Sequence, residues 1–151
     1  MLDKILNLFK CLSDHDVKYV VIGGVAAMVH GLPRSTFDVD LLIEATEENA
    51  QRLLDAFLDA GLRTASLTGA KQLLSKEITS FRDLLLVDVQ TRTPGLPFEQ
   101  AWANRVEIKY KEQPIFVASK ADVIASKRAA NRRRDQEDVR ILLALDEDKK
   151  A

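Results

Sequence analysis

The stretch VVIGGVAAMVHGLPRSTFDVDL, residues 20–41, decides the fold. Its β-branched beginning predicts a buried strand that ends at Gly23-Gly24. A short helix over 25–30 and a second strand over 37–43 are expected to follow. Glycines let the backbone approach a ligand closely, and the start of a helix offers free N–H groups that suit phosphate. The stretch therefore predicts a strand, a phosphate-binding turn and a second strand.

Two carboxylates, Asp38 and Asp40, lie two residues apart on the second expected strand, so they point to the same face. Side by side they repel each other, and burying them without a partner is costly. A divalent cation is the usual relief, and carboxylate oxygens suit Mg²⁺, which also keeps positions for water and phosphates. Such a pair can hold two ions for in-line phosphoryl chemistry. The pattern therefore indicates a magnesium site beside the glycine turn.

A third carboxylate is normally needed in a site of this kind. Asp88 is the one acid inside the apolar strand pattern LLVDV of residues 85–89, where an acid is costly without a partner. The alternative for Asp88 is a solvated edge position. Asp83 competes for the same role, but its place in an expected turn makes it the weaker candidate. We therefore expect Asp88 to complete the set.

The rest of the chain alternates between helical and extended patterns. Expected helices cover 3–14, 46–60, 98–104, 119–131 and 134–145. Besides the strands at 17–22 and 37–43, expected strands cover 76–80, 84–90, 106–110 and 113–117, the last two as edge strands. We expect an α/β (α+β) fold in which helices pack on a mixed sheet of about five strands. One domain of residues 1–151 is expected, with the helices from about residue 119 packed on the sheet.

Composition limits the partners and the compartment. The 151 residues include 22 basic and 23 acidic ones, so a net charge of −1 gives no general attraction to nucleic acid or membranes. The run from Arg132 to Arg134 could contact nucleic-acid phosphates, or it could be a basic helix boundary. The single Cys11 excludes an intramolecular disulfide and suits a reducing cytoplasm. The longest apolar run, 19–29, is too short for a membrane span, so we expect a cytoplasmic protein without a membrane partner.

Motifs at both ends of the chain resemble one known family. Gly-Gly, thirteen residues and then Asp-Val-Asp-Leu resembles the motif of the nucleotidyltransferase superfamily, which has the DNA polymerase β-like fold. The form RSTFDVD, residues 34–40, resembles the bacterial branch of stand-alone and abortive-infection toxin nucleotidyltransferases. ADVIASK at 121–127 and RRRDQEDV at 132–139 resemble the lysine helix and the Arg-x-Asp-x-x-Asp motif of that branch. The resemblance extends over most of the chain.

The resemblance implies a nucleotide and metal site near the first two strands. Gly23 and Gly24 would cradle the triphosphate, and Asp38 and Asp40 would bind Mg²⁺ or Mn²⁺. Asp88 would complete the metal site and activate the acceptor hydroxyl. The family often has serine where this chain has Gly24, so one hydroxyl contact to phosphate is absent from the pattern.

Further nucleotide contacts are implied on either side of this set. Lys127 would meet phosphate, or else lie on a solvated helix face, and Asp135 would orient Lys127 or a neighbouring arginine. Arg34 would contact phosphate or pair with the first carboxylate of the site. Ser35 and Thr36 would contact the nucleotide or serve only as turn residues.

The resemblance implies an enzyme that moves a nucleoside monophosphate from an NTP, such as ATP, to an acceptor hydroxyl and releases pyrophosphate. The acceptor could be RNA, a protein side chain or a small molecule such as an aminoglycoside. The alternative is a component of a toxin–antitoxin or other regulatory pair that acts mainly through partner binding. The intact carboxylates favour the enzyme, while the short chain favours an acceptor site built with a partner protein or a second copy. A non-catalytic nucleotide sensor is the third hypothesis.

Overall fold

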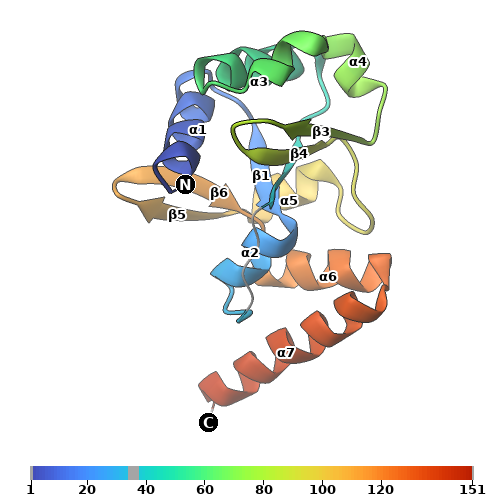
Figure 1. Ribbon diagram of the computed structural model, residues 1–151. Helices are drawn as coiled ribbons and strands as arrows, with labels where there is room; N and C mark the ends of the chain where they lie inside the picture. The colour runs from blue at the N-terminus through green and yellow to red at the C-terminus, as the bar shows by residue number, and fades with distance from the viewer. Residues whose placement is uncertain (1, 34–37, 151) are drawn as a thin grey trace.

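The computed structural model describes residues 2–33 and 38–150, which form helices around one mixed sheet (Figure 1). The strands are β1 Tyr19–Ile22, β2 Asp38–Ile43, β3 Ile78–Arg82, β4 Leu86–Gln90, β5 Val106–Tyr110 and β6 Gln113–Val117. Their order across the sheet is β3-β4-β2-β1-β6-β5. The hairpins β3–β4 and β5–β6 therefore flank the central pair, β2 and β1, and each hairpin joins that pair through a parallel strand.

Pairing of the central strands brings the expected acids together. β2 runs antiparallel to β1 with Ile22 opposite Asp40, and it runs parallel to β4 with Asp40 opposite Asp88. Paired strands lie about 4.8 Å apart, so Asp40 and Asp88 are neighbours on one face of the sheet. Asp38 precedes Asp40 by two residues and points to the same face. Gly23 follows Ile22 directly, so the glycine turn begins beside the same carboxylates.

Seven α-helices lie in the described part of the chain, and none of them is long and apolar enough to cross a membrane. They are α1 Leu2–Asp14, α2 Gly23–Val29, α3 Glu47–Asp59, α4 Ala70–Leu74, α5 Phe98–Asn104, α6 Lys120–Ala130 and α7 Arg133–Lys150, with a short 3₁₀ helix at Arg63–Leu67. The Thr46 hydroxyl accepts a hydrogen bond from the backbone of Asn49 and begins α3. Ser119 begins α6 in the same way, as the sequence predicts.

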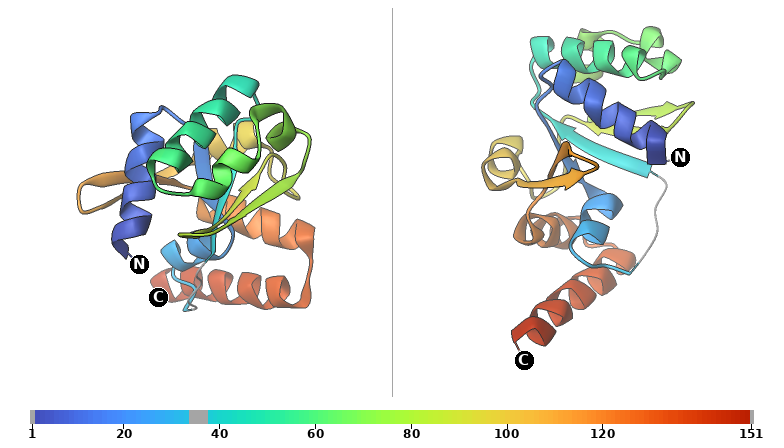
Figure 2. Two further views of the ribbon diagram at one scale, coloured as in Figure 1. Left: turned by 45° about the horizontal axis from the view of Figure 1, so that its top comes forward. Right: turned by 90° about the vertical axis from the view of Figure 1, so that its left-hand side faces the viewer.

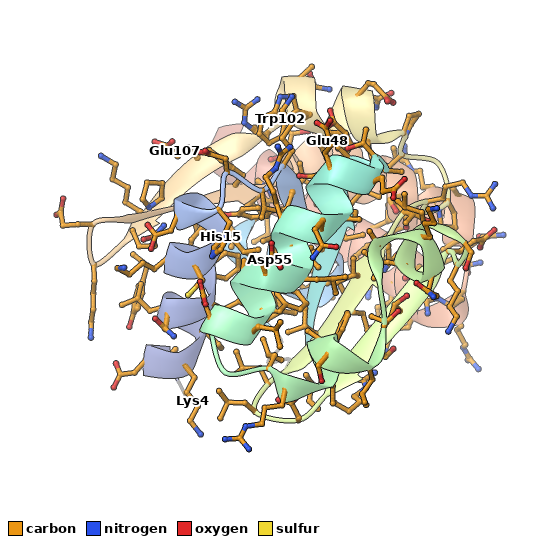
Figure 3. All side chains as sticks on the ribbon, turned by 90° about the horizontal axis from the view of Figure 1, so that it is seen from above. Lys4, His15, Glu48, Asp55, Trp102 and Glu107 are labelled. Atoms are coloured by element: carbon orange, nitrogen blue, oxygen red, sulfur yellow. The ribbon has the colours of Figure 1, made fainter. Side chains whose placement is uncertain are left out.

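The helices form layers on the two sides of the sheet. α1 and α3 lie side by side over one face (Figure 3), where the rings of Phe9 and Tyr19 are 5.6 Å apart and those of Phe57 and Phe81 are 5.0 Å apart. α6 and α7 lie on the side away from α1 and α3 (Figure 2). Side chains alternate along a strand, so the carboxylate face is the one turned away from α1 and α3. The carboxylates of Asp38, Asp40 and Asp88 therefore face the side of the sheet on which α6 and α7 lie.

The expected α/β class is confirmed, with corrections in detail. The sheet has six strands in the described residues, where about five were expected, and each of the six strand segments indicated by the sequence patterns contributes one of them. β6 is not the edge strand that we expected, because it pairs in parallel with β1 through Val21 and Val117. β4 begins two residues late because 83–85 form the hairpin turn. α2 begins at Gly23 itself, and the short helices between α3 and β3 were not expected.

Candidate active site

The glycine turn is shaped by the carboxylate beneath it. Gly23 has a φ of +68°, a conformation that residues with a side chain rarely adopt. A Cβ placed at Gly23 would also overlap the carboxylate of Asp40. Glycine is therefore required here by both the backbone angle and the space. Gly24 continues into α2, whose first turn presents backbone N–H groups next to Asp40.

The three carboxylates differ in their surroundings. The Asp38 side chain is 44% exposed, whereas that of Asp88 is 18% exposed. The Asp88 Oδ1 atom is buried and accepts no hydrogen bond from the described residues. Its nearest cation is the Arg82 guanidinium, with Nη2 at 3.1 Å but without hydrogen-bond geometry. A buried carboxylate oxygen without a donor is costly, so Asp88 is suited to a cation.

Arg82 reaches this cluster from the edge strand β3. Its Nη1 lies 3.4 Å from Asp38 Oδ1, and its Nη2 lies 3.1 Å from Asp88 Oδ1. Nothing in the local sequence pattern singles out Arg82, because its contacts depend on the pairing of β3 with β4 and of β4 with β2. Arg82 is thus a site residue that the sequence reasoning missed.

Burial and neighbouring like charges change the protonation of Asp40. Burial is the largest cause that raises the pKa of Asp40. The charges of Asp88 and Asp38 raise this pKa further, as does the hydrogen bond with Asp88, to about 7. Arg82 acts in the opposite direction and lowers the pKa. Without a cation, Asp40 is therefore half protonated near neutral pH. A group that gives up a proton when a cation arrives is a natural metal ligand.

Asp40 makes the metal-free protein less stable as the pH rises. The unfolded chain loses this proton near the ordinary aspartate pKa of 3.8 and the folded chain near 7, so stability falls between these values and levels off above pH 7. We expect Asp40→Asn to exceed wild type in free energy of unfolding at pH 8 by on the order of 2 kcal/mol, with little difference at pH 4. Urea unfolding in EDTA across this range measures the difference, and a difference independent of pH would contradict the raised pKa.

The C-terminal helices supply a buried charged network. Lys127 on α6 lies 2.9 Å from Asp138 and 3.8 Å from Asp135, both on α7. Arg132 binds Asp135 through its Nε at 2.7 Å, its Nη2 at 3.3 Å and its backbone N–H at 3.2 Å. Burial opposes the charge of Asp135, but these bonds outweigh it and lower its pKa. The side chains of Asp135 and Asp138 are each 1% exposed and that of Lys127 is 12% exposed, so these three are interior, whereas Arg132, at 65%, lies at the surface.

This network refines the expected roles. Asp135 contacts both the lysine and the neighbouring arginine, which were alternatives in the sequence. The principal partner of Lys127 is Asp138, which belongs to the motif at 132–139 but was not predicted to be a site residue. The signal for Asp138 was its spacing of three residues from Asp135, which puts both on one side of α7. The hydrogen bond to Asp135 is the largest cause that raises the pKa of Arg132, and the negative charge of Asp40 raises this pKa further.

A cleft of about 650 Å³ joins the two halves of the site. Seven of the expected site residues line it: Gly23, Gly24, Asp38, Asp40, Asp88, Lys127 and Asp135. The expected contacts Arg34, Ser35 and Thr36 lie outside the described residues. The cleft also contains Ile78, Gln90, Arg132, Arg134 and Asp138, which were not assigned to the nucleotide and metal site.

Asp83, the alternative candidate for the third carboxylate of the site, has a structural role instead. Its carboxylate accepts hydrogen bonds from the Thr64 backbone at 2.9 Å and hydroxyl at 2.6 Å, and from the Leu84 backbone. Burial is the largest single influence and opposes its charge, but the bonds from Thr64 and Leu84 together outweigh burial and lower the pKa of Asp83. It is not among the described residues that line the cleft. Asp83 is therefore a turn residue that ties the hairpin to the 3₁₀ helix.

The carboxylate cluster can be compared with what a hard cation requires. In the described ranges, 2–33 and 38–150, no three His, Cys, Asp or Glu side chains form a ready-made metal cage. Arg82 lies between Asp38 and Asp88, which keeps the carboxylates from closing on one point. Their oxygens are nevertheless the donors that Mg²⁺ prefers, and Mg²⁺ usually keeps several water and phosphate ligands. With the orphaned oxygen of Asp88, the residues fit a divalent cation shared with a substrate.

The family of the chain follows from comparison with known proteins. Residues 1–146 match the family described as nucleotidyltransferase of unknown function (DUF6036). The chain belongs to this family. The match includes the glycine turn, the three carboxylates and the charged network of α6 and α7 in one family unit. The motif resemblance found in the sequence is thereby confirmed at the level of the nucleotidyltransferase family.

Two solved structures share the fold of this chain although their sequences are less than 20% identical to it. A protein of Thermotoga maritima, described as a candidate nucleotidyltransferase, superposes with a TM-score of 0.58 at 16% identity, over 95% of this chain and 92% of that chain. An antigenic nucleotidyltransferase-like protein of Paracoccidioides brasiliensis has a TM-score of 0.58 at 18% identity, over 93% of this chain and 74% of that chain. No curated protein matches the chain. At these identities the likeness concerns the fold alone.

Proposed function

We propose that the protein is a divalent-metal-dependent nucleotidyltransferase that moves a nucleoside monophosphate from an NTP, such as ATP, to an acceptor hydroxyl. The main observation in support of this proposal is that Asp40 on β2 pairs with Asp88 on β4, directly beneath the glycine turn at Gly23. This places a carboxylate pair next to backbone N–H groups in one cleft. Metal-assisted attack of an acceptor hydroxyl on the α-phosphorus of a triphosphate uses those two kinds of group side by side.

The residues of the cleft have separable roles in this reaction. Asp38, Asp40 and Asp88 would hold Mg²⁺ or Mn²⁺, which when bound would neutralise the triphosphate and lower the pKa of the acceptor hydroxyl. The N–H groups at Gly23 and Gly24 would donate to phosphate oxygens. Asp88, paired with the outer hairpin strand β3, would orient the acceptor hydroxyl. Pyrophosphate leaves when the acceptor oxygen bonds to the α-phosphorus.

The cationic contact to phosphate is better assigned to Arg134 than to Lys127. Two buried carboxylates already offset the charge of Lys127. Arg134 is exposed, lines the same cleft and takes part in no ion pair among the described residues. Its guanidinium can bind a phosphate with two parallel hydrogen bonds. Lys127 would then hold α6 and α7 together behind the phosphate contact.

Transfer of labelled nucleotide tests the proposal. The protein is incubated with each NTP, labelled in turn at the α- or the γ-phosphate, with Mg²⁺ or Mn²⁺ and separate RNA, protein and small-molecule fractions. We expect metal-dependent label in one fraction from the α-phosphate and none from the γ-phosphate. The fraction that is labelled identifies the acceptor class, and a partner protein or a second copy would be recognised by its effect on the rate.

Two double variants make the labelling result interpretable. Asp38→Ala/Asp40→Ala should abolish the transfer. Glu48→Ala/Asp55→Ala changes two exposed acids on the outer side of α3 (Figure 3) and should transfer normally. Equal labelling by the Asp38/Asp40 variant would refute the assignment of these acids. An absence of NTP binding in calorimetry with Mg²⁺ would refute the nucleotide site, and partner binding without transfer would favour the regulatory alternative.

A further inference from the structure

Arg82, on β3, contacts two carboxylates that belong to other strands, Asp38 on β2 and Asp88 on β4. In the register of the sheet, Arg82 and Asp38 both pair with Leu86, so they flank one position of β4 from either side. The guanidinium spans this position, with Nη1 3.4 Å from Asp38 Oδ1 and Nη2 3.1 Å from Asp88 Oδ1. One planar cation thus bridges the two outer members of the carboxylate cluster.

The oxygens that face Arg82 are the ones that a metal would need. Asp88 Oδ1 is buried and accepts no hydrogen bond from the described residues, so Arg82 is the charge that offsets it. A Mg²⁺ ion binds carboxylate oxygens at about 2.1 Å and would repel a guanidinium placed against the same atoms. A divalent cation that bound both Oδ1 atoms would take the position between Asp38 and Asp88 that the guanidinium bridges. Entry of the cation therefore requires the guanidinium to move.

The fold lets Arg82 move without disturbing the core. β3 is the edge strand of the sheet, and the Arg82 side chain is 47% exposed. Ion pairs at this exposure are weak, and long side chains re-orient in nanoseconds. The partners that stay behind are fixed on β2 and β4, inside the sheet.

We propose that Arg82 is the exchangeable counter-ion of the metal site: it bridges Asp38 and Asp88 in the metal-free protein and is displaced when divalent cations bind. It is a positioning residue, because it keeps two repelling carboxylates at the site until the metal replaces it. The inference rests on the proposed function, since it concerns the metal site of that reaction. A divalent ion competes better than K⁺ for this position because it offers two charges to the same oxygens.

Binding of Mn²⁺ alone, measured by calorimetry without nucleotide, tests the exchange. We expect Arg82→Gln to bind Mn²⁺ roughly fivefold more tightly than wild type, because the ion no longer displaces a bridging cation. Arg82→Lys, which keeps the charge but cannot bridge two carboxylates with a planar fork, should lie between them. Arg134→Gln is the matched control, since it removes one charge from the same cleft without removing a described ion pair, and it should change the affinity less than about twofold.

An unchanged or weaker affinity in Arg82→Gln would overturn the proposal, as would an equal gain in Arg134→Gln, which would reduce the effect to net charge. A measurement on the wild-type protein does not depend on how the variants fold. The Nε–H resonance of Arg82, assigned in the wild-type protein through its couplings to the side-chain carbons, should shift as Mg²⁺ is added. A resonance that stays in place while Mg²⁺ binds would overturn the exchange.

The outcomes separate this inference from the proposed function. If wild type binds Mn²⁺ and NTP while Arg82 stays in place, the metal site stands and only the exchange is refuted. If neither wild type nor Arg82→Gln binds Mn²⁺, the metal site is refuted and the exchange with it. If Arg82→Gln binds Mn²⁺ where wild type shows little binding, Arg82 is the competing cation and both proposals are supported.

Discussion

Replacing Asp88 by asparagine is expected to lower the rate of nucleotidyl transfer by on the order of 10³-fold or more while leaving the protein folded. Asp88 holds a buried oxygen that accepts no hydrogen bond among the described residues, and its carboxylate contacts Arg82 and Asp40, which belong to the same site. Asparagine also removes one charge beside Asp40 and so relieves repulsion. Release of pyrophosphate measures the rate, and urea unfolding measures the stability.

Asp83→Asn is the matched control for Asp88→Asn, because both acids lie in the β3–β4 hairpin. We expect the reverse pattern: transfer close to wild type and a loss of about 1 kcal/mol in free energy of unfolding, since Asp83 accepts bonds from Thr64 at the surface. If Asp83→Asn abolished transfer and Asp88→Asn did not, the third acid of the site would be Asp83.

Replacing Asp138 by alanine is expected to lower the free energy of unfolding by about 3–5 kcal/mol, which is the range for breaking a buried ion pair. The variant leaves the Lys127 ammonium, only 12% exposed, without its partner at 2.9 Å. Asp135 lies 3.8 Å from the same ammonium and is already held by Arg132, so it compensates only in part. Urea unfolding at pH 7 measures the loss.

Glu137→Ala controls for the removal of an acid from α7. Glu137 lies next to Asp138 in the chain, but its pair with Arg140 is at the surface, with side chains 60% and 75% exposed. We expect a loss below about 0.5 kcal/mol. The double variant Lys127→Met/Asp138→Leu should recover most of the stability lost in Asp138→Ala, because it removes both buried charges. A loss in Asp138→Ala no larger than that in Glu137→Ala would contradict the buried network.

Much of the fold could be predicted because its signals are local. The helix starts at Thr46 and Ser119 depend on a side chain and a backbone group three residues apart. The bounds of the β5–β6 hairpin follow from alternating residues around one turn. The position of β6 inside the sheet could not be predicted in the same way, because its parallel partner β1 lies far away in the sequence.

The residues of the candidate site likewise fall into those that local spacing predicts and those that depend on contacts between distant elements. The glycine turn and the pair Asp38–Asp40 can be recognised from spacing, because residues two apart on a strand share a face whatever surrounds them. The bridge from Arg82 depends on the register of three strands, and the choice of Asp88 over Asp83 depends on a turn that binds Thr64.

Local spacing was therefore sufficient for the metal and nucleotide hypothesis, and long-range pairing was required to complete it. Gly23 shows both sides: a glycine is expected from the turn, but the reason that no side chain fits is the Asp40 carboxylate on another strand. The buried partner of Lys127 depends likewise on the packing of α6 against α7. Sequence spacing records which groups share an element, whereas contacts between elements arise only when the chain has folded.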